Sequence, residues 1–270
     1  MNLLIATSLV LLLADISVTS SRARHSIGGF NKRIIYGKNA ELYDIPYQVG
    51  IFVRGKKEWN LLCGGVLIKI DKVLTAAHCM EDETAMNTKV AVGLLDSVGA
   101  PTQYEQFIYV KKIKIHEGYE NVASDLAILT LATPAILNNN VKVAQLADDS
   151  SDFVDTPCII SGWGRNNYSD NAFPNRLQKT SVMLLSQEEC IYYWSDQSEG
   201  IDNKEFVCVA SEQGDSTSCN GDSGGPLLCG PNLDKLVGVL SFGTTNCPTE
   251  YPVVYTDVTQ YHRSWIEKNS

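Results

Sequence analysis

Apolar residues along this chain fall into short runs that are separated by segments rich in turn-forming residues. The runs alternate or cluster in the strings "LLCGGVLIKI", "KVLTAA", "QFIYVKKIKI", "DLAILTL", "CIISGWG" and "LVGVLSFG". Short runs bounded by Gly, Asn, Asp and Ser are typical of strands. Helical spacing is found at the end of the chain, where Val258, Tyr261, Trp265 and Ile266 share one face of "VTQYHRSWIEKN". The pattern predicts an all-β barrel or sandwich with a C-terminal helix.

One longer apolar run, "LLIATSLVLLLA", covers residues 3–14. It is shorter than the roughly 20 residues that a helix needs to span a bilayer. The run fits the hydrophobic part of a secretory signal, although no Lys or Arg precedes it. Small residues follow, so we expect a signal peptide over 1–20, with cleavage near Ser20 or alternatively near Ala14. The protein is then expected to be secreted and extracellular.

Composition and charge narrow the function further. The chain has 270 residues, of which 44% are hydrophobic and 20% charged, as expected for one or two folded domains. Its formal net charge of −9 indicates an acidic surface, which repels phosphate groups. We therefore expect neither nucleic acid nor an anionic membrane among its partners.

The cysteine content predicts disulfides and argues against zinc. Eight cysteines in a chain with a secretory start favour four disulfide bonds. No two of them form a CxxC pair, which structural zinc sites commonly use. Spacing alone leaves about 105 connectivities open.

A serine in an unusual setting is the first candidate for chemistry. The string "SCNGDSGGPL" places Ser223 after an aspartate and before two glycines. Glycine admits a positive φ and lets a second molecule approach the backbone closely, so the string predicts a shaped loop. An ordinary turn uses the same residue types. The loop therefore becomes informative only together with other residues.

Two further strings supply the partners that a serine nucleophile needs. "LTAAHC" places His78 at the end of a predicted strand, and "SDLAIL" places Asp125 just before a buried one. Taken singly, a histidine or a strand-entry aspartate is more often structural. A serine hydroxyl, however, is a poor nucleophile until a base accepts its proton and a carboxylate orients that base. The three strings together thus predict covalent catalysis.

In this order and spacing, "LTAAHC", "DLAIL" and "GDSGGP" resemble the chymotrypsin-like serine peptidases from Ile34 to the C-terminal helix. The resemblance implies two six-stranded antiparallel β-barrels packed together. It makes Ser223 the nucleophile of an acyl-enzyme mechanism, His78 the general base and then acid, and Asp125 the group that holds the imidazole tautomer. The backbone N–H groups of Gly221 and Ser223 would form the oxyanion hole.

The resemblance also assigns the disulfides and the cofactors. No cofactor or metal is expected. In particular, Leu94 stands where calcium-binding relatives carry a glutamate, so no calcium site is expected in that loop, although Glu105 is present. The implied disulfide pairs are Cys63 with Cys79, Cys158 with Cys229, Cys190 with Cys208, and Cys219 with Cys247.

The string "KRIIYGKNA" resembles the family's activation junction. Cleavage after Arg33 by a trypsin-like peptidase would free Ile34, whose new ammonium group would pair with Asp222. Residues 21–33 would then be the activation propeptide and 34–270 the peptidase domain. A dibasic pair before a strand is also found in solvated loops, which is the alternative interpretation.

The pocket residues implied by the resemblance predict the cleavage preference. Trypsin-type members carry an acid six residues before the nucleophile, where this chain has Thr217, and Val253 occupies a wall position that is glycine in many relatives. We expect cleavage after uncharged apolar residues, in the chymotrypsin-like to elastase-like range. The implied substrate-binding residues are Thr217, Ser218, Ser241, Phe242, Gly243 and Val253.

The leading hypothesis is a secreted zymogen of a serine endopeptidase that acts on proteins or peptides as a monomer. Protein inhibitors of serine peptidases are expected as further partners. Two alternatives are a catalytically silent homologue that binds partners and a structural β-domain held by disulfides, but neither explains the three catalytic strings. The string "NYS" at Asn167 is a candidate glycosylation acceptor.

Overall fold

The computed structural model describes residues 37–99, 102–165, 173–194, 204–212, 214, 216–244 and 247–270. Contacts divide the chain into the units Met1–Phe30 and Asn31–Ser270, and every described residue belongs to the second unit. The predicted signal peptide, the propeptide, the junction at Arg33 and Ile34, and Asn167 lie outside the described residues.

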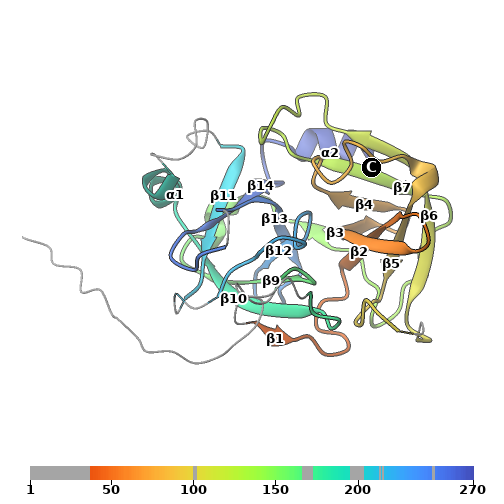
Figure 1. Cartoon of the computed structure of the whole chain (residues 1–270). Coiled ribbons are helices and arrows are strands. Elements are labelled where there is room, and N and C mark those ends of the chain that lie inside the picture. Colours follow the sequence, from red (N-terminus) through yellow and green to blue (C-terminus); the bar gives the residue numbers. More distant parts are fainter. Residues whose placement is uncertain are drawn as a thin grey trace, which may run out of the picture. The chain divides into compact units, whose positions relative to one another are not determined.

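The first part of the second unit is a closed antiparallel barrel of six strands (Figure 1). The strand order around the barrel is β2-β3-β4-β7-β6-β5, so sequence neighbours mostly pair as hairpins. Its strands are β2 (Gln48–Arg54), β3 (Trp59–Lys69), β4 (Lys72–Thr75), β5 (Thr88–Val92), β6 (Gln106–Ile115) and β7 (Ala127–Leu131).

A second ring of antiparallel strands follows the order β10-β11-β14-β13-β12-β9 and closes because β9 also pairs with β10. Two short strands, β1 (Lys38–Asn39) and β8 (Gln145–Leu146), attach to β10 and β13. The strands of the ring are β9 (Pro157–Gly162), β10 (Gln178–Leu184), β11 (Phe206–Ala210), β12 (Pro226–Cys229), β13 (Lys235–Phe242) and β14 (Val253–Asp257). The predicted fold of two six-stranded β-barrels is therefore confirmed.

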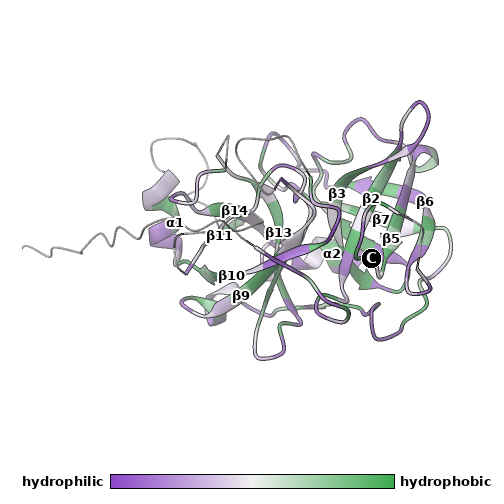
Figure 2. Cartoon of the chain, turned by 60° about the horizontal axis from the view of Figure 1, so that its bottom comes forward, coloured by the Kyte–Doolittle hydropathy of each residue, from purple (hydrophilic) through white to green (hydrophobic). Residues whose placement is uncertain are grey.

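Buried apolar residues from the strands form the cores of the two barrels, and the strands of both barrels contain many hydrophobic residues (Figure 2). Val49, Val66 and Leu129 are among the fully buried residues of the first core, and Ile160, Val237 and Tyr255 are buried in the second. The catalytic candidates are thus carried at the ends of rigid strands.

The C-terminal helix is confirmed but is shorter than the sequence pattern suggests. Helix α2 spans Arg263–Asn269, whereas helical spacing begins at Val258. The Asp257 carboxylate accepts hydrogen bonds from the backbone N–H and the hydroxyl of Thr259, both at 2.6 Å. An aspartate that bonds two residues ahead favours a turn over a helix, which delays the helix start.

A second helix, α1 (Gln187–Trp194), was not expected from the apolar pattern. Its start carries a capping box: the Ser186 backbone N–H donates to Glu189 Oε2 at 3.1 Å, and the Glu189 N–H donates to Ser186 Oγ at 3.3 Å. The string "SQEE" was therefore the sequence signal for this helix. Among the described residues, no helix has the length and apolar character needed to cross a membrane.

The four disulfides join the pairs that the family resemblance implied. Cys63–Cys79 ties β3 to the segment that carries His78, and Cys219–Cys247 ties the Ser223 loop to the segment before β14. A native disulfide typically stabilises a small secreted domain by about 2–5 kcal/mol, so these two bonds help to fix the loops that carry the candidate residues.

Candidate functional site

The Ser223 loop of the second barrel packs directly against strands of the first barrel. The Gly64 N–H on β3 donates a 2.8 Å hydrogen bond to the Ser223 carbonyl oxygen. Gly224 has a φ of +77°, and a side chain there would collide with Thr75 Oγ1 and the Gly64 carbonyl. A glycine is therefore needed after Ser223 for the loop to approach β3 and β4 so closely.

His78 and Asp125 form a tightly bonded pair at the end of the first barrel. His78 Nδ1 lies 2.7 Å from Asp125 Oδ2, and the His78 backbone N–H donates to Asp125 Oδ1 at 2.9 Å. The Ser241 hydroxyl on β13 donates to Oδ2 at 2.6 Å. Asp125 is only 1% exposed, so these bonds stabilise its buried charge and orient the imidazole.

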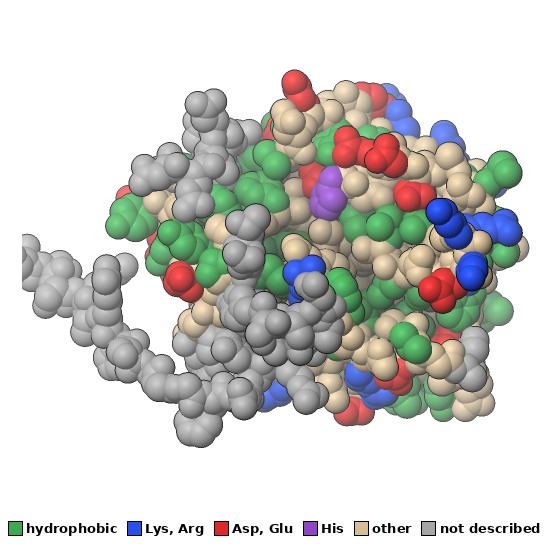
Figure 3. Space-filling view, in the orientation of Figure 1, with side chains coloured by type: hydrophobic (Ala, Val, Ile, Leu, Met, Phe, Trp, Pro, Cys, Tyr) green, Lys and Arg blue, Asp and Glu red, His purple; other side chains and the backbone are tan. Residues whose placement is uncertain are grey.

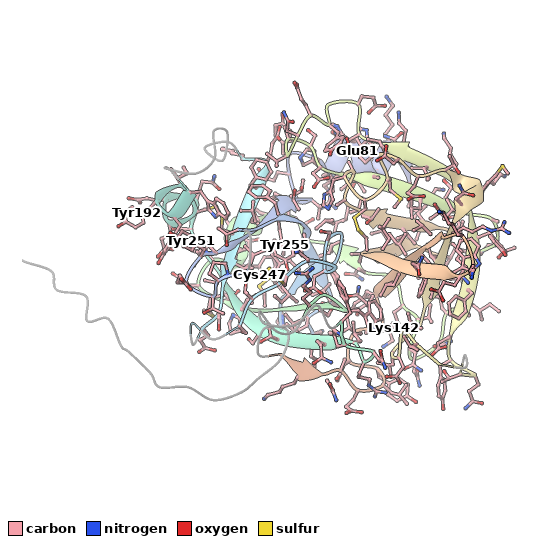
Figure 4. All side chains as sticks on the ribbon, in the orientation of Figure 1. Glu81, Lys142, Tyr192, Cys247, Tyr251 and Tyr255 are labelled. Carbon is pink, nitrogen blue, oxygen red and sulfur yellow. A yellow bond between two sulfur atoms is a disulfide. The ribbon has the colours of Figure 1, made fainter. Side chains whose placement is uncertain are left out.

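The surroundings of His78 make its imidazole a stronger base. Burial on its own lowers the pKa of His78, but the hydrogen bond and charge of Asp125, with the charge of Glu81, outweigh burial and raise the pKa above the ordinary 6.5. Glu81, labelled in Figure 4, and the buried Asp125 are the acidic residues whose charges act on His78. The site is therefore anionic around its base.

Ser223 lies near this pair without being bonded to it. Among the described residues no hydrogen bond joins the Ser223 hydroxyl to His78, and His78 Nε2 lies 3.7 Å from Cys79 Sγ. Catalytic hydrogen bonds are often long in ligand-free sites and tighten when substrate binds. The Ser223 side chain borders a cavity, where a substrate could reach it.

Two neighbouring backbone N–H groups, those of Gly221 and Ser223, lack an acceptor among the described residues. Gly221 has a φ of +99°. A side chain at Gly221 would lie 3.1 Å from Gly164 Cα and 3.0 Å from the Phe173 ring. Both residues are partly exposed, so the two N–H groups are available to an acceptor atom of a bound molecule.

The neighbouring carboxylate of Asp222 is directed into the protein, where it is 3% exposed. It accepts hydrogen bonds from the Gly164 N–H at 2.7 Å and the Cys219 N–H at 2.9 Å. Side chains at Gly162 or Gly164 would collide with it. Burial raises the pKa of Asp222 to about 6, although the two N–H donors oppose this effect. A cation beside this carboxylate would therefore be stabilising.

A cavity of about 200 Å³ adjoins Ser223. Of the expected substrate-binding residues, Ser218, Ser241, Phe242, Gly243 and Val253 line it. Thr217 is buried but does not line it, whereas Ser218, whose hydroxyl lies 3.0 Å from the Tyr255 hydroxyl, is one of several uncharged polar residues that do. No charged residue is found among the described residues that line the cavity.

Several contacts of the site were not visible in the sequence. We assigned Ser241 to substrate binding, and the structure adds its bond to Asp125, which is 116 residues away in the chain. The Tyr255 hydroxyl behind the cavity and the close fit of Gly162 and Gly164 to Asp222 also depend on distant chain segments. No local motif marks any of these contacts.

One group of potential metal ligands occurs among the described residues, namely Cys63, His78 and Cys79. The two cysteines form a disulfide, so neither offers a thiolate to a metal ion.

Comparisons with known proteins agree with this architecture. A family model described as Trypsin matches residues 34–266. A fibrinolytic enzyme, isozyme C, of Lumbricus rubellus is 34% identical over 246 residues, which cover 88% of this chain and 100% of that protein. A trypsin of Sarcophaga bullata is 33% identical over 244 residues, or 88% of this chain and 89% of that protein. The solved structure of neuropsin, a serine protease expressed in the limbic system of mouse brain, matches with a TM-score of 0.72 and 33% identity, covering 86% of this chain and 98% of that one.

Proposed function

This chain belongs to the trypsin family and is a serine endopeptidase, and we propose that it is a secreted zymogen that cleaves polypeptides after uncharged apolar residues. Secretion is supported by the apolar run at residues 3–14 and by the four disulfides, which persist in oxidising compartments. Its substrates are proteins. We also propose that it acts as a monomer and is open to protein inhibitors of serine peptidases.

In the proposed mechanism, Ser223 Oγ attacks the scissile carbonyl carbon while His78 Nε2 takes the hydroxyl proton. The protonated imidazole then gives this proton to the leaving amine, and an acyl-enzyme remains on Ser223. Water completes the cycle through the same base. The 2.7 Å contact with Asp125 supports this assignment, because it leaves Nε2 as the free acceptor and stabilises the imidazolium that forms.

The negative charge that develops on the carbonyl oxygen would be bound by the N–H groups of Gly221 and Ser223. Loss of one such donor typically costs about 2.7–4 kcal/mol of transition-state stabilisation. The observation that carries the proposal is the ordered His78–Asp125 pair together with the Gly221 and Ser223 N–H groups, which have no acceptor among the described residues.

Activation would depend on Asp222. Cleavage after Arg33 would create an ammonium group on Ile34, and its insertion beside the buried carboxylate would offset the charge that burial destabilises. The same insertion would hold the adjoining Gly221–Ser223 backbone in the shape needed for the oxyanion.

The cavity beside Ser223 supports an apolar preference before the scissile bond. An apolar side chain gains roughly 25 cal/mol per Å² buried there, whereas Lys or Arg would lose hydration without a partner charge among the described lining residues. Val253 lines the cavity opposite Gly243, and we propose that its side chain limits the depth to which a substrate side chain enters.

A peptide library cut by the activated enzyme tests this specificity. We expect cleavage mainly after Leu, Met, Phe or Ala, with differences of about 10- to 200-fold at most per methylene. Val253→Gly should shift the preference toward Phe and Tyr, with hydrolysis after Ala as the internal control. Dominant cleavage after Lys or Arg by the wild-type enzyme would contradict the pocket assignment.

A further inference from the structure

A groove of about 480 Å³ begins at Gly221 and follows the first barrel. The second barrel contributes Trp163 and Phe173 to its lining, with the Phe173 ring beside Gly221, and the first barrel contributes Leu62, Phe52 and Trp59. It does not share the lining of the cavity that contains Ser218 and Val253. The cavity and the groove, which we call the two openings, therefore both border the Ser223 loop but have different lining residues.

The two openings imply a direction for a bound polypeptide, and this step rests on the proposed function. If the cavity takes the side chain before the scissile bond, the scissile carbonyl lies against Gly221. The chain beyond that carbonyl then leaves along the groove. The residues of the groove would accordingly contact the leaving-group side of a substrate.

The far end of the groove opens onto four aromatic side chains, Phe52, Trp59, Phe107 and Tyr109, which we call the aromatic surface. Phe52 and Phe107 make an edge contact with ring centroids 5.8 Å apart, and Trp59 and Tyr109 make one at 6.0 Å. Phe107 and Tyr109 are exposed on β6. Exposed aromatic rings gathered in this way are more typical of binding surfaces than of inert surface.

A lysine is held among these rings. Lys89 Nζ lies 4.6 Å from the Trp59 ring centroid, 4.8 Å from that of Phe107 and 5.8 Å from that of Phe52. The β-ladder places Lys89 opposite Phe52 on one side and opposite Tyr109 on the other. The aromatic surface therefore carries a positive charge at its centre.

More positive charges surround the aromatic surface, in contrast to the net charge of −9 for the whole chain. Arg54 ends β2, Lys56 and Lys57 lie in the turn between β2 and β3, and Lys111 lies two residues after Tyr109 on β6. All four are exposed, and none forms an ion pair with a described residue. Glu58 is the acid in this turn. In Figure 3 Lys and Arg side chains gather over the β2 and β6 side of the first barrel.

We propose that the aromatic surface binds a segment of a polypeptide substrate that lies beyond the scissile bond and contains an aromatic residue next to several acidic residues. Rings of the segment would stack on Trp59 and Tyr109, and its carboxylates would meet Arg54, Lys56, Lys57 and Lys111. The continuity of the groove with Gly221 favours the substrate's own chain over a separate partner. Charge complementarity at such a rim acts mainly on association and is sensitive to salt.

The test compares activated enzyme on peptides that are identical through the scissile bond. One peptide continues with a spacer and Phe-Asp-Glu-Glu, a second with Phe-Ser-Ser-Ser and a third with Phe-Lys-Lys-Lys, each with spacers of two to six residues. A short chromogenic amide without leaving-group residues completes the set. We expect kcat/KM to be about 10-fold higher for the best acidic peptide than for its serine counterpart, and we expect this advantage to fall as salt is raised from roughly 0.05 to 0.5 M.

Two variants assign the effect to the surface. Trp59→Ala and the double variant Arg54→Ala/Lys57→Ala should each remove most of the advantage and leave hydrolysis of the short amide within about two-fold of wild type. Lys142→Ala, which removes an exposed lysine outside the turn and the aromatic surface, is the matched control and should keep the advantage.

Each outcome separates this inference from the proposed function. Failure of the activated enzyme to cut the short amide would overturn the proposed function. Cleavage of the short amide with equal kcat/KM on all extended peptides would overturn only the aromatic-surface proposal. A third outcome is that the chain binds anionic vesicles, that the double variant does not, and that no peptide is preferred. This outcome would indicate that Arg54, Lys56, Lys57 and Lys111 bind a membrane, and it would also overturn the aromatic-surface proposal.

Discussion

The two carboxylate oxygens of Asp125 accept different hydrogen bonds, which together orient the His78 imidazole. Oδ1 accepts the His78 backbone N–H, while Oδ2 accepts from both the imidazole and Ser241. An amide in place of the carboxylate would favour the wrong imidazole tautomer and remove the charge that stabilises the imidazolium.

Asp125→Asn should therefore lower kcat by about 10⁴-fold, which is the effect known for an equivalent replacement in this family. The thermal unfolding midpoint serves as the control and should stay near that of wild type, because Asn fills the same volume. Retention of more than about a tenth of the activity would contradict the role given to Asp125.

The pH dependence of kcat/KM should report the same contacts. His78 must be neutral to accept a proton, and its pKa is raised above 6.5, so activity should rise with pH through a midpoint above 6.5. At alkaline pH, activity should decline as the Ile34 ammonium loses its proton, above the range of about 7.7–8.0 for a free α-amino group. Undiminished activity at strongly alkaline pH would contradict the proposed pairing of the Ile34 ammonium group with Asp222.

Among individual residues, the sequence predicted those that stand in a recognisable local motif. Ser223, His78 and Asp125 each stand in a short distinctive string, because the shape of each loop is encoded next to the residue it carries. Ser241 and Tyr255 could not be assigned in the same way, because their partners Asp125 and Ser218 are 116 and 37 residues distant. The displacement of Thr217 from the cavity lining likewise depends on how the loop folds.

Among the elements, helix α2 carries an unusual buried base at its start. His262 is 1% exposed, and neither ring nitrogen has a hydrogen-bond partner among the described residues. Its ring makes an edge contact with His116 at 5.2 Å. Burial, with the nearby His116, lowers the pKa of His262 to about 4. The folded protein therefore holds this imidazole neutral where the unfolded chain would bind a proton.

The free energy of unfolding should consequently decrease as pH falls from about 6.5 toward 4, because the unfolded state binds more protons in that window. His262→Phe should reduce the loss of melting temperature between pH 7.5 and 4.5, since Phe does not titrate. Burial raises the pKa values of Asp222 and Asp257, so these two groups increase the free energy of unfolding as pH falls. Because the wild type and the His262→Phe variant both contain them, they do not affect the comparison. An identical acid shift in the variant and the wild type would contradict this account of α2.

The quoted apolar strings correspond to β3, β4, β6, β7, β9 and β13 with small differences at their ends, because alternation and clustering reflect burial directly. The string "QFIYVKKIKI" coincides with β6, and "LVGVLSFG" differs from β13 by one residue at each end. The helices were harder to predict. Helix α1 has a capping box but only two buried residues, and an Asp257–Thr259 turn precedes α2.

For the whole molecule, the proposal implies that activity is withheld until the chain is cut. The carboxylate of Asp222 is buried, and the partner proposed for it is the amino group that cleavage after Arg33 would create. Arg33→Gln should block activation by a trypsin-like peptidase, and treated and untreated variant should hydrolyse a short amide equally slowly. Full activity in the uncut wild-type chain would contradict the zymogen proposal.

The most direct test of the central claim is covalent labelling of the cleaved chain with a serine-directed phosphonate, followed by peptide mass spectrometry. The account predicts about one label per molecule, located on Ser223, and little label on the intact chain, where the oxyanion donors are not yet held in place. A cleaved chain that takes no label, or takes it on another residue, would contradict the assignment of Ser223 as the nucleophile.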